Sequence, residues 1–229
     1  MSLHPSAKSR HRTARLIQQT LLSYERQTAA YLRRWGRRRY RCPRLLVEWL
    51  KILKPGAMVL DLGCGPGQDV RYLREREFRG VGLDLAWPFL RFARQRSRRA
   101  PLVQADIRGL PFRPEPFDGI WAGASLIHLP KPAVRRTLFE LHSSVHPGGI
   151  LGATFTHGHT SGFLKTGWIP GRFFSRWLKA ELANAVRCAG WEILSLQTVT
   201  NRERKGRWLN LLARHSVERQ DFKNLPAKP

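Results

Sequence analysis

The sequence predicts an α/β fold with a mostly parallel sheet that is covered by helices on both faces. The first observation behind this prediction is a regular alternation, between residues 58 and 155, of short apolar runs with amphipathic segments. Parallel strands need crossover connections of this kind, and the helices that make them cover both faces of the sheet. The second observation is a pair of strand-like runs at residues 191–200 and 207–214, joined by the polar turn NRERKG. Their closeness in sequence favours antiparallel pairing.

The region before the alternation is predicted to be helical. Residues 1–13 are basic and are expected to form a flexible tail. Over residues 17–35, apolar side chains recur mostly at three- and four-residue steps, which is typical of one face of an amphipathic helix. Residues 44–53 indicate a second helix that a Pro-Gly pair closes. Together these segments predict an N-terminal helical cap over residues 14–54.

Each element of the alternating region follows from its own pattern. Short buried runs predict strands at residues 58–63, 80–86, 101–106, 117–123 and 148–155. Amphipathic segments predict helices at residues 68–76, 88–96 and 132–145, and from an N-cap at Ser175 to Cys188. A glycine-rich, irregular stretch is expected over residues 156–172. Residues 14–215 are therefore expected to form a single domain, followed by a polar tail at residues 216–229.

The net charge is the unusual feature of the composition. The chain carries 41 Lys and Arg residues against 16 acidic ones, which gives a formal net charge of +25. One basic cluster without any acid consists of Arg91, Arg94, Arg96, Arg98 and Arg99. Such charge favours a polyanion such as RNA, or an anionic substrate, as the partner, but a solvated basic surface explains it equally well.

Cysteine usage and hydropathy narrow the setting of the protein. Cys42, Cys64 and Cys188 are scattered and form no pair with metal-binding spacing, which predicts a reduced chain without a metal site. The longest mostly apolar run, around residues 120–129, is about half the roughly twenty residues that a membrane span needs. The basic start lacks a following apolar stretch, so a secretory signal is not predicted. We therefore expect a cytoplasmic protein without membrane insertion.

The central motif is VLDLGCGPGQD at residues 59–69, where a buried strand runs into three glycines at alternate positions. A dinucleotide-binding loop would carry a glycine at position 68, where this chain has glutamine, and a P-loop would end in Gly-Lys-Ser or Gly-Lys-Thr. No basic residue within the loop can meet a phosphate. The glycines are therefore expected to give room to a ligand part other than a phosphate.

Two acidic residues follow the loop at the ends of the next two predicted strands. Asp84 can accept hydrogen bonds from both hydroxyls of a ribose. Asp106 can accept from an adenine amino group, while the aliphatic Ile107 lies on the ring. Because ligands bind at the carboxyl ends of the strands in such sheets, these positions offer room for an aminoacyl tail, a ribose and an adenine in order. An adenosine without phosphates fits this arrangement better than a dinucleotide.

These motifs together resemble those of the class I S-adenosylmethionine-dependent methyltransferases. VLDLGCGPGQD is similar to the first motif of that family, GVGLDLA to its acidic second motif and VQADIRGLPF to its adenine-contact motif. FDGIWAGASLIHL resembles the fourth motif, and HPGGILGATF resembles the stretch leading into the fifth strand. The resemblance covers roughly residues 16–215. It implies a Rossmann-like, doubly wound sheet of seven strands with an antiparallel last strand, S-adenosyl-L-methionine as the cofactor, and methyl transfer as the activity.

The resemblance also implies cofactor-binding residues by position. Those that would pass the methionine portion, or orient the loop around it, are Asp61, Gly63, Cys64, Gly65 and Gly67. Those that would hold the ribose and adenine are Asp84, Leu85, Asp106 and Ile107. Ala122 and Gly123 would line the sulfonium side. Tyr24 and Tyr31 resemble a Tyr-x6-Tyr pattern on a helix that covers the cofactor in related small methyltransferases, although both fit core contacts equally well.

Histidines are the candidate residues on the acceptor side. His128 lies just past the fourth strand, and its unperturbed pKa of roughly 6.5 suits a general base that removes a proton from a hydroxyl or an amine. A positioning or packing role fits the same residue. His157 and His159 follow the fifth strand and either line the acceptor pocket or lie in solvent.

The acceptor itself is only partly narrowed by the sequence. The fourth strand is followed by AGASLIHLP instead of the Asn/Asp-Pro-Pro-aromatic signature of many amino-methyltransferases that act on bases. Cytosine C5 chemistry is disfavoured as well, because no cysteine follows that strand closely. Two hypotheses remain: a small-molecule acceptor enclosed by the N-terminal helix and the glycine-rich stretch, or an RNA whose phosphates are held by the basic surface. A non-catalytic binding protein is disfavoured by the intact pocket motifs.

Overall fold

The computed structural model describes residues 7–36, 40–96, 100–114, 116–167, 169–201 and 206–216. The first elements are helix α1 (Ala7–Arg26), helix α2 (Thr28–Tyr31), the π-helical turn η1 (Leu32–Gly36) and helix α3 (Arg44–Leu50). The hydroxyl of Thr28 donates to the backbone carbonyl of Tyr24 at 3.0 Å, and this side-chain bond competes with helix bonding where α1 and α2 separate. The helix predicted over residues 17–35 is therefore interrupted. It also begins earlier, at Ala7, inside the segment expected to be a tail.

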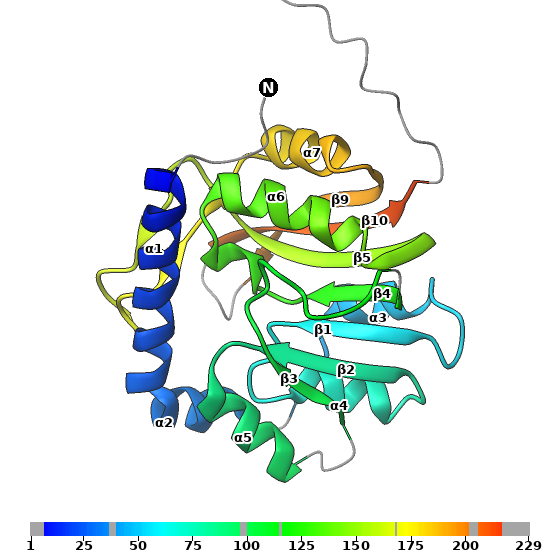
Figure 1. Ribbon diagram of the computed structural model, residues 1–229, viewed down its shortest axis with the longest axis horizontal. Helices are drawn as coiled ribbons and strands as arrows, with labels where there is room; N and C mark the ends of the chain where they lie inside the picture. The colour runs from blue at the N-terminus through cyan, green and yellow to red at the C-terminus, as the bar shows by residue number, and fades with distance from the viewer. Residues whose placement is uncertain are drawn as a thin grey trace, which may run out of the picture.

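A mixed sheet forms the centre of the molecule (Figure 1). Its strands lie in the order β3 (Leu102–Gln104), β2 (Arg79–Asp84), β1 (Met58–Leu62), β4 (Phe117–Ala122), β5 (Val145–His157), β10 (Gly206–His215) and β9 (Trp191–Asn201). The strands from β3 to β5 are parallel, and β10 is antiparallel to both of its neighbours. The strand order reverses between β1 and β4, so the doubly wound fold with an antiparallel last strand is confirmed.

The prediction of seven strands in the sheet is wrong by one. The additional strand, β8 (Arg176–Trp177), pairs in parallel with the end of β5 at Thr156 and His157. The pairing of β4 with β5 reaches only Ala153, so the longer β5 presents a further edge, which β8 occupies. Ser175 consequently lies in the extended chain before β8, and helix α7 (Lys179–Cys188) begins later than predicted. Within the glycine-rich stretch, β6 (Gly162–Phe163) pairs with β7 (Phe173–Phe174).

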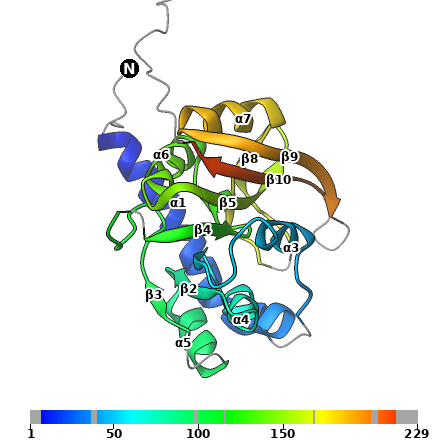
Figure 2. The same cartoon turned by 90° about the vertical axis from the view of Figure 1, so that its right-hand side faces the viewer.

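Helices cover both faces of the sheet (Figure 2). Helices α3 and α4 (Gln68–Arg74) lie against one face and α6 (Lys131–His142) and α7 against the other, whereas α5 (Trp87–Arg96) packs beside β2 and β3. Successive residues of β1 point into the two layers, Val59 toward Trp49 and Leu60 toward the larger cluster. All three side chains are fully buried, and each such burial contributes about 1.5–3 kcal/mol to stability. This two-sided core fixes the strand ends that form the site.

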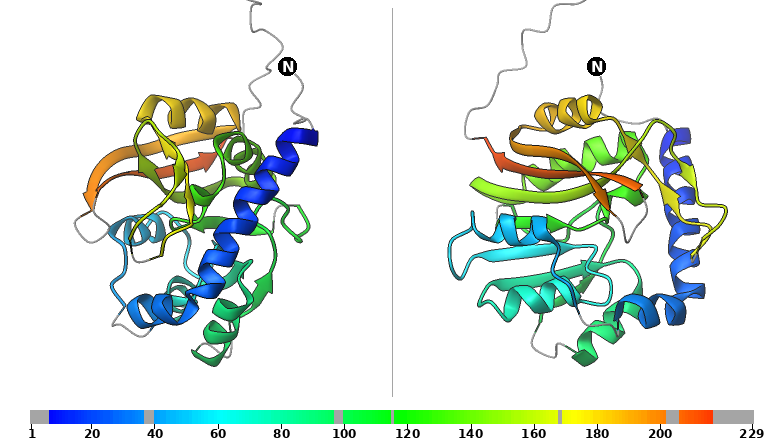
Figure 3. Two further views of the ribbon diagram at one scale, coloured as in Figure 1. Left: turned by 90° about the vertical axis from the view of Figure 1, so that its left-hand side faces the viewer. Right: turned by 180° about the vertical axis from the view of Figure 1, so that it is seen from behind.

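Helix α1 crosses the edge at which the parallel strands end, as Figures 1 and 3 show from several sides. The backbone N–H of Phe173 in β7 donates to the hydroxyl of Thr20 in α1 at 3.0 Å. The N-terminal helix and the glycine-rich stretch are thereby joined, and together they border the carboxyl edge of the sheet.

Candidate functional site

The three glycines of the loop after β1 have different roles. Their φ angles are +76° at Gly63, +53° at Gly65 and +78° at Gly67, in the left-handed region that side-chain-bearing residues rarely adopt. A Cβ at Gly63 would lie 2.4 Å from the Cβ of Ser125, and one at Gly67 would lie 2.7 Å from a side-chain atom of α5. These two glycines are therefore required by packing. At Gly65, a Cβ would meet only the hydroxyl of Tyr31, at 3.9 Å, so this glycine is the one that opens the backbone to a ligand.

Asp84 connects this loop to the end of β2. One carboxylate oxygen accepts the N–H of Gly65 and the other accepts the N–H of Ala86, each at 2.8 Å. Burial raises the pKa of Asp84 above its ordinary value, while these backbone donors favour the ionised form. Each carboxylate oxygen has a second lone pair. Asp84 can therefore orient the loop and hold the hydroxyls of a ribose at the same time.

Two further aspartates lie behind the loop. Asp69, in the first turn of α4, accepts the hydroxyl of Tyr40 at 2.6 Å and the indole N–H of Trp121 at 2.7 Å. Asp61 is 2% exposed, and its Oδ2 has no hydrogen-bond partner among the described residues. Burial, together with the nearby charge of Asp69, raises the pKa of Asp61 well above its ordinary value. A bound cation would satisfy Oδ2 and favour the ionised carboxylate.

The carboxylate expected to meet an adenine is already engaged by an arginine. Arg108 donates to Asp106 through Nε at 3.0 and 3.1 Å and through Nη2 at 2.7 Å. The apolar side chains of Leu85 and Ile107 line the cavity beside this pair. An adenine amino group that reaches Asp106 would therefore share the carboxylate with Arg108.

One cavity joins all of these groups. Its volume is about 1070 Å³, at the upper end for ligand pockets in proteins. The predicted site residues that line it are Tyr24, Tyr31, Asp61, Gly63, Cys64, Gly65, Asp84, Leu85, Asp106, Ile107, Gly123 and His128. Gly67 and Ala122 do not line it, because Gly67 packs beneath α5 and Ala122 is fully buried in the core. His157 and His159 also lie outside it.

His128 ends the short helix η2 (Leu126–His128) and lines the cavity just past the end of β4. Its Nδ1 is 2.8 Å from the backbone carbonyl of Phe173, which can only accept, so Nδ1 carries the proton. Nε2 then accepts the hydroxyl of Tyr24 at 2.8 Å. Burial and the positive charge of Arg172 lower the pKa of His128 to about 4, because both disfavour a charged imidazolium. The candidate base is thus neutral, and its acceptor nitrogen is occupied by Tyr24.

An aromatic cluster joins the N-terminal helices to α5. The ring centroids of Tyr24 and Tyr31 are 5.5 Å apart, and Phe89 lies 5.7 Å from the first and 4.7 Å from the second. Edge-to-face and tilted contacts of this kind stabilise a cover over the cavity. Both tyrosines line the cavity as well, so the packing contact is observed and their contact with the cofactor stays a prediction.

The comparisons with known proteins agree with this site. Residues 59–149 match the family model described as a methyltransferase domain. The malonyl-[acyl-carrier protein] O-methyltransferase of Salmonella typhimurium is 40% identical over 98 residues, which cover 43% of this chain and 38% of the relative. The chain carries a class I S-adenosylmethionine-dependent methyltransferase domain. The 2-phytyl-1,4-naphtoquinone methyltransferase of Thermosynechococcus vestitus is 39% identical over 125 residues, 51% of this chain and 54% of that relative.

These curated relatives are matched over only 38% and 54% of their own length, so the likeness concerns the methyltransferase domain and not their whole chains. Among solved structures, the 1,6-didemethyltoxoflavin-N1-methyltransferase of Burkholderia thailandensis, with bound 1,6-didemethyltoxoflavin and S-adenosylhomocysteine, has a TM-score of 0.69. It is 20% identical, and the match covers 94% of this chain and 93% of that one. At this identity the likeness shows the fold, and the acceptor has to be argued from the site.

S-adenosylmethionine is the cofactor of a methyltransferase domain of this class, and the residues present fit it. The ammonium group of its methionine portion matches the unpartnered oxygen of Asp61, and Gly65 leaves room for the tail. The glycine loop itself offers no Lys or Arg side chain to a phosphate, and the acidic residues that line the cavity are Asp61, Asp69, Asp84 and Asp106. Among the described residues, no group of three His, Cys, Asp or Glu side chains could hold a metal ion.

Sequence reasoning missed several residues of the methyltransferase site. Asp69 is the last residue of the glycine motif and could have been found, but its bonds come from Tyr40 and Trp121, which are distant in sequence. Arg108 follows Asp106 by two residues, so the ion pair between them could have been predicted from their closeness in sequence. Arg172 belongs to a stretch without periodicity, and nothing in its neighbours indicated that it would contact α1.

Proposed function

We propose that the protein transfers the methyl group of S-adenosylmethionine to a small-molecule acceptor that binds in the same cavity. The observation that carries this proposal is the continuity of the cavity. It extends from the aspartates at the ends of β1 and β2 to His128 and the glycine-rich stretch, within about 1070 Å³. Such a volume suits a cofactor together with an acceptor of modest size.

The chain's own residues would bind the cofactor from three sides. Asp61 would accept from the ammonium group, and Asp84 would accept from the ribose hydroxyls. Leu85 and Ile107 would lie against the adenine, next to Asp106. When bound, S-adenosylmethionine supplies an activated methyl group. The protein then has to align the acceptor with that group and exclude water, which requires few reacting side chains.

Exclusion of water would be the task of the helical cover. Tyr24 and Tyr31 line the cavity from α1 and α2 and pack on Phe89 of α5. The hydrogen bond from the backbone N–H of Phe173 to the Thr20 hydroxyl connects helix α1 of this cover to the glycine-rich stretch. A small molecule of modest size fits within a cavity bordered in this way. Two curated relatives are named as a malonyl-[acyl-carrier protein] O-methyltransferase and a 2-phytyl-1,4-naphtoquinone methyltransferase, and these names also support an acceptor other than nucleic acid.

The direct test is incubation of the protein with S-adenosylmethionine labelled in its methyl group and a cell extract separated into metabolite and RNA fractions. The proposal expects label in the metabolite fraction. Label confined to the RNA fraction would contradict it. A matched control is the variant Asp84→Ala, which should transfer no label to either fraction, because it would lose the carboxylate that accepts from the ribose.

RNA methylation is the second candidate function, and helix α5 provides the observation that favours it. Trp87 is 53% exposed, and Arg91, Arg94 and Arg96 are exposed on the same helix. Exposed aromatic and basic side chains of this kind stack on bases and contact phosphates. The other members of the cluster, residues 98 and 99, lie outside the described residues. Binding to bulk tRNA that falls log-linearly and steeply with salt would support RNA, and weak, salt-insensitive binding would exclude it.

The proposed setting is the cytoplasm. Cys42, Cys64 and Cys188 are free thiols, which suits a reducing compartment. In the part of the chain that the structure describes, no helix is long and apolar enough to cross a membrane.

A further inference from the structure

One end of the cavity is lined by arginines and by no described carboxylate, whereas aspartates and arginines together line the other end. The acidic residues that line it belong to the cofactor end, at the ends of β1, β2 and β3 and in the first turn of α4, where Arg34, Arg41 and Arg44 also line the cavity. The end bordered by the glycine-rich stretch and by β10 is lined by Arg172, Arg176 and Arg207, and the described lining residues there include no carboxylate. A pocket of this sign attracts an anion to the side of the cavity where the acceptor has to bind.

Arg172 is the most enclosed of these arginines. It is 7% exposed, and its Nε donates to the backbone carbonyl of Ile169 at 3.0 Å. Its Nη1 donates to the hydroxyl of Tyr24 at 3.2 Å, and its guanidinium carbon lies 5.3 Å from the Tyr24 ring centroid and 5.2 Å from that of Phe174. Two rings and a carbonyl therefore hold the planar fork in one orientation at the cavity wall. A fixed guanidinium matches the geometry of a carboxylate.

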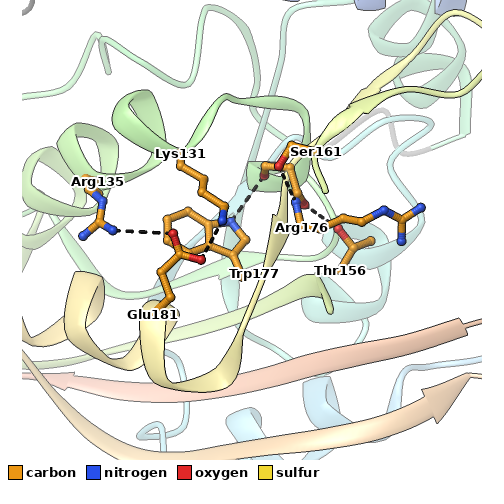
Figure 4. Close-up of polar contacts among 8 residues, drawn as sticks. Lys131, Arg135, Thr156, Ser161, Arg176, Trp177 and Glu181 are labelled. Atoms are coloured by element: carbon orange, nitrogen blue, oxygen red, sulfur yellow. Dashed lines mark hydrogen bonds and ion pairs between the residues drawn. The ribbon is translucent and has the colours of Figure 1, made fainter. Parts of the chain in front are cut away.

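Arg176 borders the same region from β8. Figure 4 shows that Trp177 points toward Lys131 and Glu181, whereas Arg176 extends away from them. Neighbouring residues of a strand point to opposite faces, so the burial of Trp177 against α6 and α7 directs Arg176 toward the cavity that it lines. The register places Arg176 next to Thr156, which pairs with Trp208 on its other side. The positive charge is thus built into the sheet edge and is not confined to one loop.

The absence of an available base among the groups described at the acceptor end also favours an anionic acceptor. An alcohol or an ammonium group has to lose a proton before or during methylation, so it needs a base. In this structure Nε2 of His128 already accepts the Tyr24 hydroxyl, and Tyr24 in turn accepts from Arg172. A carboxylate is ionised at neutral pH and needs no base. The hydrogen-bonded residues Arg172, Tyr24 and His128 can therefore position an acceptor that binds as an anion.

We propose that the methyl acceptor is an organic acid whose carboxylate lies against Arg172 and is itself methylated. The inference rests on the proposed methyl transfer. In the balanced step, a carboxylate oxygen donates an electron pair to the methyl carbon, and the carbon–sulfur bond breaks with its electrons returning to sulfur. The products are a methyl ester and S-adenosylhomocysteine, and no proton is released. The apolar side chains that line the same end, Ile17, Leu21, Leu164, Phe174 and Trp208, would contact the body of the acid.

The lability of the product in base tests this inference. The protein is incubated with methyl-labelled S-adenosylmethionine and either a small-metabolite extract or a panel of acids, octanoate, phenylacetate and benzoate, with their primary amides as matched probes. Products are then treated with mild alkali, which releases the methyl group of a carboxylate ester as volatile methanol and leaves ethers and methylated amines intact. The inference expects volatile label from the extract and, within the panel, label from acids and none from amides.

Variants connect that label to the arginine. Arg172→Gln should lower ester formation about ten- to hundredfold at low acceptor concentration, the usual effect of losing a charge-assisted hydrogen bond. Arg172→Lys should retain more activity, and the exposed Arg187→Gln on α7 should match the wild type. Binding of S-adenosylhomocysteine, measured by calorimetry on each variant, should be unchanged. This second measurement separates a lost acceptor contact from a misfolded chain.

The outcomes distinguish the two proposals. Base-labile label that depends on Arg172 supports the organic acid. Base-stable label in the metabolite fraction overturns the organic acid and leaves the proposed methyl transfer standing. Base-labile label that Arg172→Gln forms as fast as the wild type, with cofactor binding intact, overturns the role of Arg172. Absence of label from every fraction, in a protein that binds the cofactor, overturns the proposed function and the acceptor with it.

Discussion

A matched pair of alanine substitutions separates the packing role of the glycine loop from its ligand role. At Gly63, alanine must adopt a φ of +76° and place a Cβ 2.4 Å from the Cβ of Ser125. The left-handed backbone costs about 1–2 kcal/mol, and overpacking of this kind costs about 1–3 kcal/mol. Alanine also restricts the unfolded chain, which offsets about 0.4–1 kcal/mol, so Gly63→Ala should lower the free energy of unfolding by about 1–4.5 kcal/mol.

Gly65→Ala should behave differently, although its φ of +53° lies in the same region of backbone space. Its Cβ would meet only the Tyr31 hydroxyl at 3.9 Å, an ordinary contact, so no overpacking is added. The backbone cost of about 1–2 kcal/mol is partly offset because alanine reduces the conformational freedom of the unfolded chain by about 0.4–1 kcal/mol. The net loss of stability should be about 1 kcal/mol, but the new methyl group stands in the cavity where the methionine portion would pass.

Urea denaturation and calorimetric titration with S-adenosylhomocysteine measure the two effects side by side. We expect Gly63→Ala to be the less stable variant by more than about 1 kcal/mol, and folded Gly65→Ala to bind the ligand at least about tenfold more weakly than the wild type. If Gly65→Ala binds like the wild type, the loop does not face the cofactor. Equal loss of stability in both variants would refute the packing argument.

Two further predictions concern buried polar groups. The pKa of His128 is lowered to about 4 from 6.5, so as the pH falls the unfolded chain takes up the proton before the folded chain does. The free energy of unfolding should therefore fall by up to about 3 kcal/mol between pH 6.5 and pH 4. His128→Gln should flatten that part of the pH profile measured by urea denaturation, and an unchanged slope would contradict the lowered pKa. Asp69→Ala should cost about 1–3 kcal/mol in urea denaturation, because the indole N–H of Trp121 loses its acceptor, and a loss within the error of the measurement would contradict this.

The elements that could be predicted from the sequence are those written in local patterns. The strand that contains Asp61 and the strand that ends in Asp84 follow from short buried runs, and their order in a parallel sheet follows from the connections between them. The cavity-lining positions of Gly65, Asp84 and Ile107 follow from the same rule, because parallel strands end at one edge.

What could not be predicted depends on contacts between distant segments. Strand β8 pairs with the part of β5 that extends beyond its pairing with β4. The sequence around Arg176 does not indicate how far β5 extends. The engagement of His128 by Tyr24 joins residues that are 104 positions apart. Ala122 was expected to line the sulfonium side, but its side chain is buried in the core. Successive residues at the end of a strand point to opposite faces, so the motif alone does not say which of them faces the cavity.

The central claim is that the edge formed by β1, β2 and β4 binds S-adenosylmethionine through its aspartates. The most direct measurement is a calorimetric titration of S-adenosylhomocysteine into the wild type, Asp84→Ala and a control, Asp118→Ala. Asp118 also accepts a backbone N–H, from Met58 at 2.6 Å, but does not line the cavity. We predict binding to the wild type and to Asp118→Ala, and an affinity at least about a hundredfold weaker in Asp84→Ala, from the loss of two charge-assisted hydrogen bonds. Unchanged affinity in Asp84→Ala would contradict the claim.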